Sequence, residues 1–314
     1  MRPPTVAPTR PSYRPYLTRV AGVQRLSPSF VRVQFAGDDL EVFSTAGLDQ
    51  RIKLILPLPD GSVSDIGQHD DEAIDAGSWY EKWRAVPSDV RSPLRTYTVR
   101  RIDPQARRLI VDFVVHHDAG PAGTWAETVE VGQELVIIGP DERSDGRRLG
   151  LDWHPGTARK VLLAGDETAV PAICSILESL DDGYDVDAFL EVPTAADFLA
   201  VDVSPRTRVT WLARQDREHG AALTEAVTDW TSRARDVLAA AAAPRRQELA
   251  DVDVDRELIW DSPEDSEGEF YSWIAGEAGT VKGLRRHLVQ GCGVDRRRVA
   301  FMGYWRLGQA ERQA

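Results

Sequence analysis

The sequence is poor in cysteine: it has only Cys174 and Cys292, and neither lies in a Cys-x-x-Cys pair. This scarcity argues against a disulfide framework and against a structural zinc or iron–sulfur site. It also favours a reducing compartment, so we expect a cytoplasmic protein. Long hydrophobic runs are missing as well, because charges or glycines interrupt every apolar stretch well before it reaches the length of a membrane span.

Positive charge is too scarce to balance the acidic residues, and the net charge is −12. This excess argues against general binding of nucleic acid through its phosphate backbone. The imbalance is not uniform, since six arginines and no acidic residue precede Asp38. These arginines are compatible with a local basic surface, and more simply with scattered solvated side chains.

The common catalytic motifs are absent: there is no His-Glu-x-x-His, no Gly-x-Ser-x-Gly and no Walker phosphate loop. The six histidines do not fall at metal-ligand spacing, and the neighbours His116 and His117 would point to opposite faces of a strand. We therefore predict no metal site. No pair of carboxylates stands out as an acid–base couple, so we expect the difficult chemistry to reside in a bound cofactor.

The chain changes character near residue 150. Before this point, six segments rich in β-branched or aromatic residues are predicted to be strands: 16–26, 29–36, 51–56, 95–102, 107–116 and 134–138. Antiparallel strands of this length favour a small closed barrel, since closure removes exposed edges. Residues 61–92 form a long insertion around Trp79, Tyr80 and Trp83, in which we expect a short helix or mobility.

Strands and helices alternate after residue 158. The predicted strands are 160–164, 186–192, 208–213, 258–260, 271–275 and 299–303, and the predicted helices are 168–180, 223–243 and 280–289. This alternation predicts a parallel sheet covered by helices on both faces, with ligands at the carboxyl ends of its strands. We expect a disordered arm over 1–15, a barrel domain over 16–150 and an α/β domain over 158–314.

Two segments of the first domain carry groups suited to a cofactor with a phosphate and a flat ring. In Arg95-Thr96-Tyr97-Thr98 an arginine can clamp phosphate, a tyrosine ring can stack on a flat heterocycle and a threonine hydroxyl can bond a ring nitrogen. An ordinary alternating strand has the same pattern. Residues 120–125, Gly-Pro-Ala-Gly-Thr-Trp, open a predicted helix whose free N–H groups suit a pyrophosphate, or they form a plain turn.

Two further segments lie at strand ends of the second domain. Gly165-Asp166-Glu167-Thr168 follows the first strand, where a dinucleotide fold binds its ligand, although two acids are unusual in a phosphate cradle. A capping role for Asp166 or Thr168 competes with that interpretation. Residues 273–277 and 303–306 end later strands at the same expected edge of the sheet, and Trp305 is either a lid over a flat ring or part of the core.

In this order, the four segments resemble the siderophore-interacting protein family of FAD-dependent ferric-siderophore reductases, within the ferredoxin–NADP reductase-like group. The resemblance runs from about Tyr16 to Arg306. It implies a six-stranded antiparallel Greek-key barrel that binds FAD, followed by a parallel-sheet α/β domain that binds NAD(P)H.

The resemblance also implies roles for individual residues. Arg95 would hold the FAD pyrophosphate, Tyr97 would pack on the isoalloxazine ring and Thr98 would lie near flavin N5. The other residues implied at the FAD are Thr96, Asp112, Val114, His116, Gly120, Ala122, Trp125 and Thr168. The residues implied at the NAD(P)H are Gly165, Asp166, Glu167, Arg214, Gly276, Glu277 and Trp305.

Lys53 and Arg51 are the residues implied to dock an anionic ferric siderophore. Three positions depart from the family pattern. His117 stands where the family has glycine, Gly123 where serine is common and Arg51 where histidine is usual. These departures affect details of the pocket rather than flavin binding.

The implied function is FAD-dependent reduction of a ferric siderophore, with release of Fe(II) and with electrons from NADH, NADPH or ferredoxin. Arg214 would meet a 2′-phosphate and favour NADPH, or it is a surface arginine with no such role. Two alternatives stay open: a general flavin reductase or electron-transfer flavoprotein, and a non-catalytic module that binds flavin or siderophore.

Overall fold

The structure is a computed structural model that describes residues 10–115, 120–249, 259–264 and 266–309. The chain divides into two compact units, one of residues 1–24 and 31–150 and the other of residues 25–30 and 151–314. Strand β1 begins at Tyr13. Residues 13–15 are therefore strand rather than part of the disordered arm expected over 1–15, of which residues 1–9 lie outside the described part. Within the described residues, no helix is long and apolar enough to cross a membrane.

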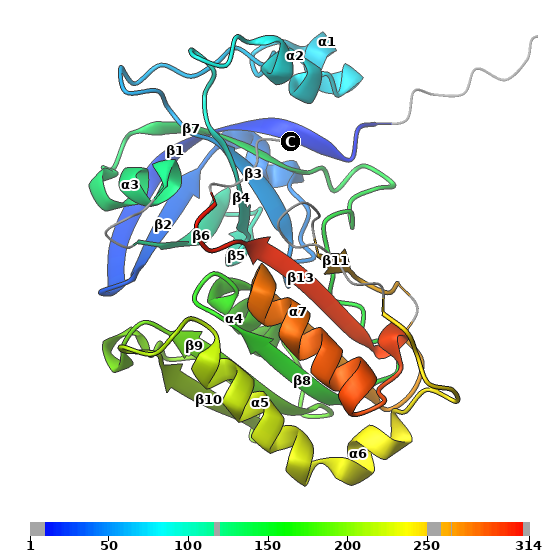
Figure 1. Ribbon diagram of the computed structural model, residues 1–314. Helices are drawn as coiled ribbons and strands as arrows, with labels where there is room; N and C mark the ends of the chain where they lie inside the picture. The colour runs from blue at the N-terminus through cyan, green and yellow to red at the C-terminus, as the bar shows by residue number, and fades with distance from the viewer. Residues whose placement is uncertain (1–9, 116–119, 250–258, 265, 310–314) are drawn as a thin grey trace, which may run out of the picture. The chain divides into compact units, whose positions relative to one another are not determined.

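The first unit is built on a curled antiparallel sheet (Figure 1). Its order is β4-β3-β7-β1-β2-β6-β5. The strands are β1 (Tyr13–Ser27), β2 (Phe30–Ala36), β3 (Arg51–Ile55), β4 (Leu94–Thr98), β5 (Arg101–Asp103), β6 (Arg108–Val114) and β7 (Glu134–Pro140). A 3-10 turn (Asp38–Val42) and helix α3 (Pro121–Thr128) complete the unit, together with two helices of the insertion.

The expected six strands become seven in the described part of this sheet, because the segment expected as one strand over 95–102 is two. The break lies at Val99 and Arg100. The N–H of Val99 still donates to Gln50 before β3, whereas the N–H of Arg100 donates to Ile110 on β6. The chain therefore changes its partner strand between these residues, which joins the two ends of the sheet order through a two-residue connection.

Both faces of this sheet carry apolar cores. On β3 and β7, Ile52, Leu54 and Ile137 belong to the inner core, whereas Ile55 and Ile138 belong to a second cluster. The second cluster is covered by the insertion, whose helices are α1 (Asp71–Ala76) and α2 (Trp79–Ala85). They are drawn in cyan near the top of Figure 1. The helix expected in the insertion is therefore confirmed.

Trp83 is the anchor of the insertion. Its side chain is 1% exposed, and its indole N–H donates to the carbonyl of Ser92 at 2.9 Å. Ser92 and Ser64 also exchange hydrogen bonds between backbone N–H and side chain, each 2.9 Å long. These bonds tie the two ends of the insertion together.

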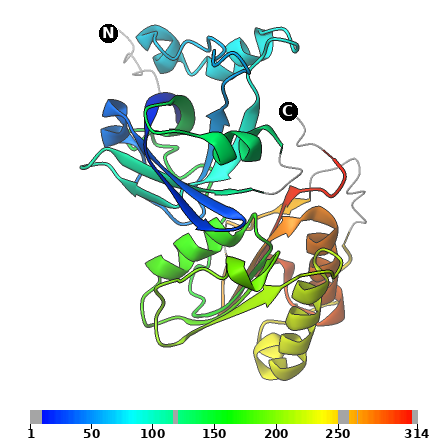
Figure 2. The ribbon, with the colours of Figure 1, turned by 90° about the vertical axis from the view of Figure 1, so that its left-hand side faces the viewer.

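The second unit contains a six-stranded sheet of order β10-β9-β8-β12-β13-β11. Figure 2 shows helices on both sides of it. Its strands are β8 (Lys160–Gly165), β9 (Asp185–Val192), β10 (Thr207–Ala213), β11 (Trp260–Asp261), β12 (Phe270–Glu277) and β13 (Val299–Trp305). The expectation of a purely parallel sheet is wrong at one edge, since β11 pairs antiparallel with Phe301 and Met302 of β13. Residue 258, expected to begin this strand, lies outside the described residues.

The helices of this unit are α4 (Val170–Ser179), α5 (Ala221–Arg233), α6 (Arg235–Ala240) and α7 (Ala278–Arg286). Short turns lie at Ala195–Asp197 and Arg296–Arg298, and α7 continues into a π-helical turn over His287–Gly291. The single helix expected over 223–243 is two, because Ala234 leaves the helical conformation with φ −94° and ψ 29°. This bend keeps both Trp230 of α5 and Leu238 of α6 in the same core.

The connectivity of the sheet has one reversal. From β8 the chain adds β9 and β10 on one side, whereas β12 pairs with the other side of β8. In open α/β sheets, ligands bind beyond the carboxyl ends of the strands at such a reversal. Gly165 ends β8 at this point and pairs in register with Ala275 of β12.

Candidate functional site

Strand β4 presents its side chains on alternate faces. Arg95 and Tyr97 pair with Leu54 and Ile52 of β3, which face the inner core, whereas Thr96 pairs with Lys53. The same register sets Thr98 opposite Arg51 on the outer face. Arg95 and Tyr97 thus share the inner face, as a clamp and a stacking ring for one ligand require.

A run of aromatic rings joins β4 to helix α3 (Pro121–Thr128). Tyr97 packs on Phe113 of β6 at 4.6 Å between ring centroids, and Phe113 packs on Trp125 of α3 at 5.4 Å. Phe35 of β2 also stacks on Trp125, at 6.3 Å between ring centroids. Two motifs that are more than 20 residues apart in the sequence are thereby brought to one part of the first unit.

Helix α3 begins without a side-chain cap, because its N-cap residue is Gly120. Pro121 occupies the first turn, so the backbone N–H groups of Ala122 and Gly123 remain at the helix start. Among the described residues, a Cβ on Gly120 would meet nothing within 4 Å, which indicates open space beside the helix end. The buried indole nitrogen of Trp125 likewise has no hydrogen-bond partner in the part of the chain that the structure describes. Free donors beside open space fit a bound phosphate group, and therefore fit FAD.

Asp112 of β6 is held by arginines. Its side chain is 2% exposed, and Arg32 donates to both of its oxygens at 2.7 and 2.8 Å. The guanidinium of Arg100 lies 3.5 Å away. The carboxylate that was expected to line the cofactor is thus bonded within the protein. Val114 ends β6 half-buried, and His116 lies outside the described residues.

Lys53 lies on the outer face of β3, opposite in direction to Tyr97. Its ammonium donates to the hydroxyl of Thr96 at 2.9 Å. Arg51 lies two residues away on the same strand, and its side chain donates to the carbonyl of Gly150 at 3.4 Å. The two cations expected to dock a siderophore therefore share one face with Thr96 and Thr98.

At the reversal of the second sheet, Asp166 gathers donors from three chain segments. Its Oδ1 accepts from the N–H and the hydroxyl of Thr168, and its Oδ2 accepts from the N–H of Glu277 at 2.7 Å. The indole N–H of Trp305 completes the set at 2.8 Å. Gly276 has φ +142°, and a Cβ there would lie 2.6 Å from Oδ2. Glycine at this position therefore permits the close approach.

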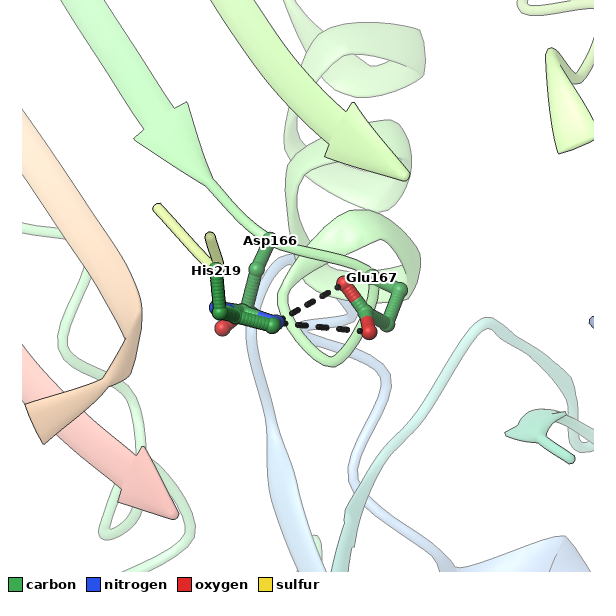
Figure 3. Close-up of side chains that lie close together, drawn as sticks. All are labelled: Asp166, Glu167 and His219. Carbon is green, nitrogen blue, oxygen red and sulfur yellow. Dashed lines mark hydrogen bonds and ion pairs between the residues drawn. The ribbon is translucent and has the colours of Figure 1, made fainter. Parts of the chain in front are cut away.

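Glu167, the next residue, belongs to a separate network. Arg214 donates to both of its oxygens at 2.9 Å, and Arg214 also donates to Glu191 at 3.2 Å. Glu191 is fully buried and accepts the N–H groups of Gly220 and Leu223 at the start of α5. Figure 3 shows the ring of His219 directed at Glu167, with its Nε2 3.4 Å from the Glu167 carboxylate.

The two adjacent acids ionise very differently. Burial and the neighbouring charge of Glu167 raise the pKa of Asp166 to about 6. Burial by itself would also raise the pKa of Glu167, but hydrogen bonds from His219 and Arg214 outweigh it and lower that pKa to about 2. Burial opposes the charged form of His219, yet the bond to Glu167 and the charges of both acids raise its pKa. Glu167 is consequently the residue that stays ionised.

Asp166, Glu167 and His219 approach one another closely enough to surround a cation, with possible ligand atoms within 4.8 Å of each other. Their oxygens are already engaged by protein donors, however. Asp166 accepts from Thr168, Glu277 and Trp305, and Glu167 accepts from Arg214. A metal ion would have to displace these bonds, so the cluster is better described as a hydrogen-bonded network.

The remaining residues expected at this edge have local structural roles. The side chain of Glu277 caps α7 by accepting the N–H of Thr280 at 2.8 Å. Gly165 packs closely, since a Cβ there would lie 2.5 Å from Ala169. Trp305 is half-buried, and its ring meets His219 edge to face at 4.8 Å. The competing interpretation of Asp166 or Thr168 as the cap of α4 is wrong, because the N-cap residue of that helix is Ala169 and no side chain caps it. The bond from the N–H of Thr168 to Asp166 lies in the turn before the helix.

Sequence reasoning missed Phe113, Arg32, Glu191 and His219. His219 lies more than 50 residues from Glu167, and only the pairing of β8, β9 and β10 brings them together. Glu191 was available as a signal, since it is an acid among the apolar residues in the second half of β9, Ala-Phe-Leu-Glu-Val. A buried acid in such a strand requires a buried cation or several N–H groups as partners.

Two family models match this chain over most of its length. Residues 19–144 match the siderophore-interacting FAD-binding domain, and residues 158–308 match the siderophore-interacting protein model. The first match contains β4, β6 and α3, and the second contains Asp166, Glu167, Arg214 and Trp305.

Comparison with individual proteins points to the same family. The chain is 28% identical over 286 residues to the ferric vibriobactin reductase ViuB of Vibrio cholerae, covering 91% of this chain and 87% of ViuB. It is similar to the crystal structure of a siderophore utilization protein from T. fusca, with 30% identity, a TM-score of 0.66 and 96% of each chain covered. The siderophore-interacting protein SipS from Aeromonas hydrophila gives 25% identity and a TM-score of 0.65, covering 96% of this chain and 94% of SipS. The chain therefore belongs to the siderophore-interacting protein family.

Proposed function

We propose that this protein is a cytoplasmic FAD-dependent reductase of ferric siderophores, whose Greek-key barrel binds FAD and whose α/β unit binds NAD(P)H. The observation that carries the proposal is the aromatic contact of Tyr97, Phe113 and Trp125, because it brings the β4 motif and the uncapped start of α3 together. A clamp, a stacking ring and free N–H groups are what a flavin dinucleotide needs. The similarity to a ferric vibriobactin reductase supports the substrate class.

FAD, when bound, accepts a hydride from a nicotinamide and passes electrons on one at a time. The protein residues bind and orient. Arg95 would neutralise the pyrophosphate, the ring of Tyr97 would pack on the isoalloxazine, and Thr98, the next residue of the strand, would lie near N5. Ala122 and the indole N–H of Trp125 would donate to phosphate oxygens. No protein nucleophile or general acid is required, in keeping with the missing motifs.

The ferric siderophore is an anionic complex in which hydroxamate or catecholate oxygens hold Fe(III). Lys53 and Arg51 offer two positive charges on one strand face for such a complex. Hard oxygen ligands favour Fe(III) over Fe(II), so reduction weakens the complex and releases iron. The protein residues contribute mainly attraction and position.

The test is anaerobic and uses the purified full chain. Flavin absorption bands are expected, with bleaching by NADH or NADPH. The flavin is expected to reoxidise on addition of a ferric hydroxamate or a ferric catecholate. Reoxidation by quinones or free flavin but by neither ferric complex would favour a general flavin reductase. If the protein binds flavin but neither NADH, NADPH nor ferredoxin reduces it, a non-catalytic binding module would be favoured.

A further inference from the structure

The second unit offers a guanidinium where an NADP-binding fold needs one. Dinucleotides bind beyond the carboxyl ends of parallel strands, and an arginine near these ends accommodates the 2′-phosphate that distinguishes NADPH from NADH. Arg214 directly follows β10 at this edge, and its N–H donates to Val192 at the end of β9. Whether its side chain can receive a phosphate depends on what it already binds.

The guanidinium of Arg214 is paired with two carboxylates. Its side chain is 14% exposed, and both terminal nitrogens donate to Glu167 at 2.9 Å. One of them also donates to Glu191, which is fully buried and fixed by the N–H groups of Gly220 and Leu223. A bidentate pair of this kind uses the donor geometry that a phosphate would otherwise take.

The surrounding charge also opposes a phosphate. The cluster contains three carboxylates, those of Asp166, Glu167 and Glu191. Its basic side chains are Arg214 and His219. A 2′-phosphate would have to displace Glu167 and leave a carboxylate of 8% exposure without its cation. A 2′-hydroxyl brings no charge and needs no such exchange.

We propose that Glu167 is a specificity-determining residue that occupies Arg214 and makes NADH, rather than NADPH, the electron donor. This rests on the proposed function only in that the donor is a nicotinamide dinucleotide. Wild-type protein is expected to prefer NADH by at least about tenfold in kcat/KM, the ratio that corresponds to about one charge-assisted hydrogen bond.

The test compares the wild type with Glu167→Gln, which keeps the size of the side chain and removes its charge. The rate of flavin reduction is measured with NADH and with NADPH, and binding of 5′-ADP and 2′,5′-ADP is measured by calorimetry. In Glu167→Gln, the ratio of kcat/KM for NADH to that for NADPH is expected to fall about tenfold, and the ratio of the Kd for 2′,5′-ADP to that for 5′-ADP is expected to fall by the same factor.

Glu225→Gln is the matched control. Glu225 forms an exposed ion pair with Arg217 at 2.7 Å in the same unit, so its loss changes the charge equally without releasing Arg214. This variant is expected to keep the wild-type preference.

A wild type that prefers NADPH, or binds 2′,5′-ADP more tightly than 5′-ADP, would overturn the inference while the reductase assignment stands. An equal change in Glu225→Gln would overturn it too, since general charge would then explain the effect. If the protein binds neither nucleotide, both the inference and a nicotinamide donor are wrong. If only the assay with ferric complexes fails, the siderophore is not the substrate, and the inference about the nicotinamide donor still stands.

Discussion

Replacing Asp166 by asparagine should change stability in a way that depends on pH. Burial and the charge of Glu167 raise the pKa of Asp166 from 3.8 to about 6. Between these values the folded protein keeps a proton that the unfolded chain has released, so folding stability falls as pH rises. This rise in pKa corresponds to about 3 kcal/mol of folding stability, which is lost as the pH rises through about 6. Asparagine cannot ionise and escapes this loss.

The amide has a cost of its own. Its nitrogen cannot accept the N–H of Thr168, which costs about 1–3 kcal/mol at any pH. Asp166→Asn is therefore expected to be destabilised at about pH 4.5 and close to wild type at about pH 7.5. The difference between the two conditions is about 2 kcal/mol and does not depend on the size of the amide penalty.

The assay is urea unfolding of fluorotryptophan-labelled protein, followed by the fluorine resonance of Trp305, which Trp305→Phe identifies. Asp197→Asn is the control, because this buried acid has a lowered pKa: burial opposes the charge, but bonds from Ser27 and Thr194 outweigh it. Its stabilising effect is present above the unfolded pKa, so its loss should not shrink as pH rises. Equal destabilisation of Asp166→Asn at both pH values would refute the reasoning.

Three other substitutions test the first unit. Arg32→Ala leaves the buried Asp112 with Arg100, 3.5 Å away, as its remaining cation within the described residues. It should lower the free energy of unfolding in urea by on the order of 3 kcal/mol, and a loss below about 1 kcal/mol would contradict the pairing. Trp83→Ala should cost about 3–5 kcal/mol and remove hydrogen-exchange protection from the insertion first, whereas uniform loss of protection would show a single cooperative core. Trp125→Phe should leave stability unchanged or slightly higher, because the indole nitrogen has no partner among the described residues. It should weaken FAD binding about tenfold in a fluorescence titration, and unchanged FAD affinity would mean that this N–H does not meet the cofactor.

Much of the fold follows from local sequence. Segments such as Phe30–Ala36 and Asp185–Val192 are rich in branched and aromatic residues between turn residues, and they form strands as expected. The division of character near residue 150 reflects a change from period-two patterns to alternating strands and helices. These features depend on neighbours within a few residues, which a sequence displays directly.

Features that depend on distant partners were not visible. Nothing local marks Val99 and Arg100 as a strand break, because neither is a glycine or proline and the break arises from a change of partner strand. Ala234 interrupts a helix in a run without glycine or proline. The sequence left two interpretations of Arg214 open. Its contacts with Glu167 and Glu191 show that its charge is paired within the unit.

The apolar cluster beneath the insertion has a consequence for comparing this protein with its relatives. Ile55, Leu94, Val136 and Ile138 lie on the outer face of β3, β4 and β7 and are covered by Trp83. A relative with a short loop in place of the insertion would expose this strip to water, and exposed strips of that kind promote association. Evolution can therefore shorten the insertion only together with polar replacements at these four positions. The length of the insertion and the polarity of these four strand positions should therefore change together across the family.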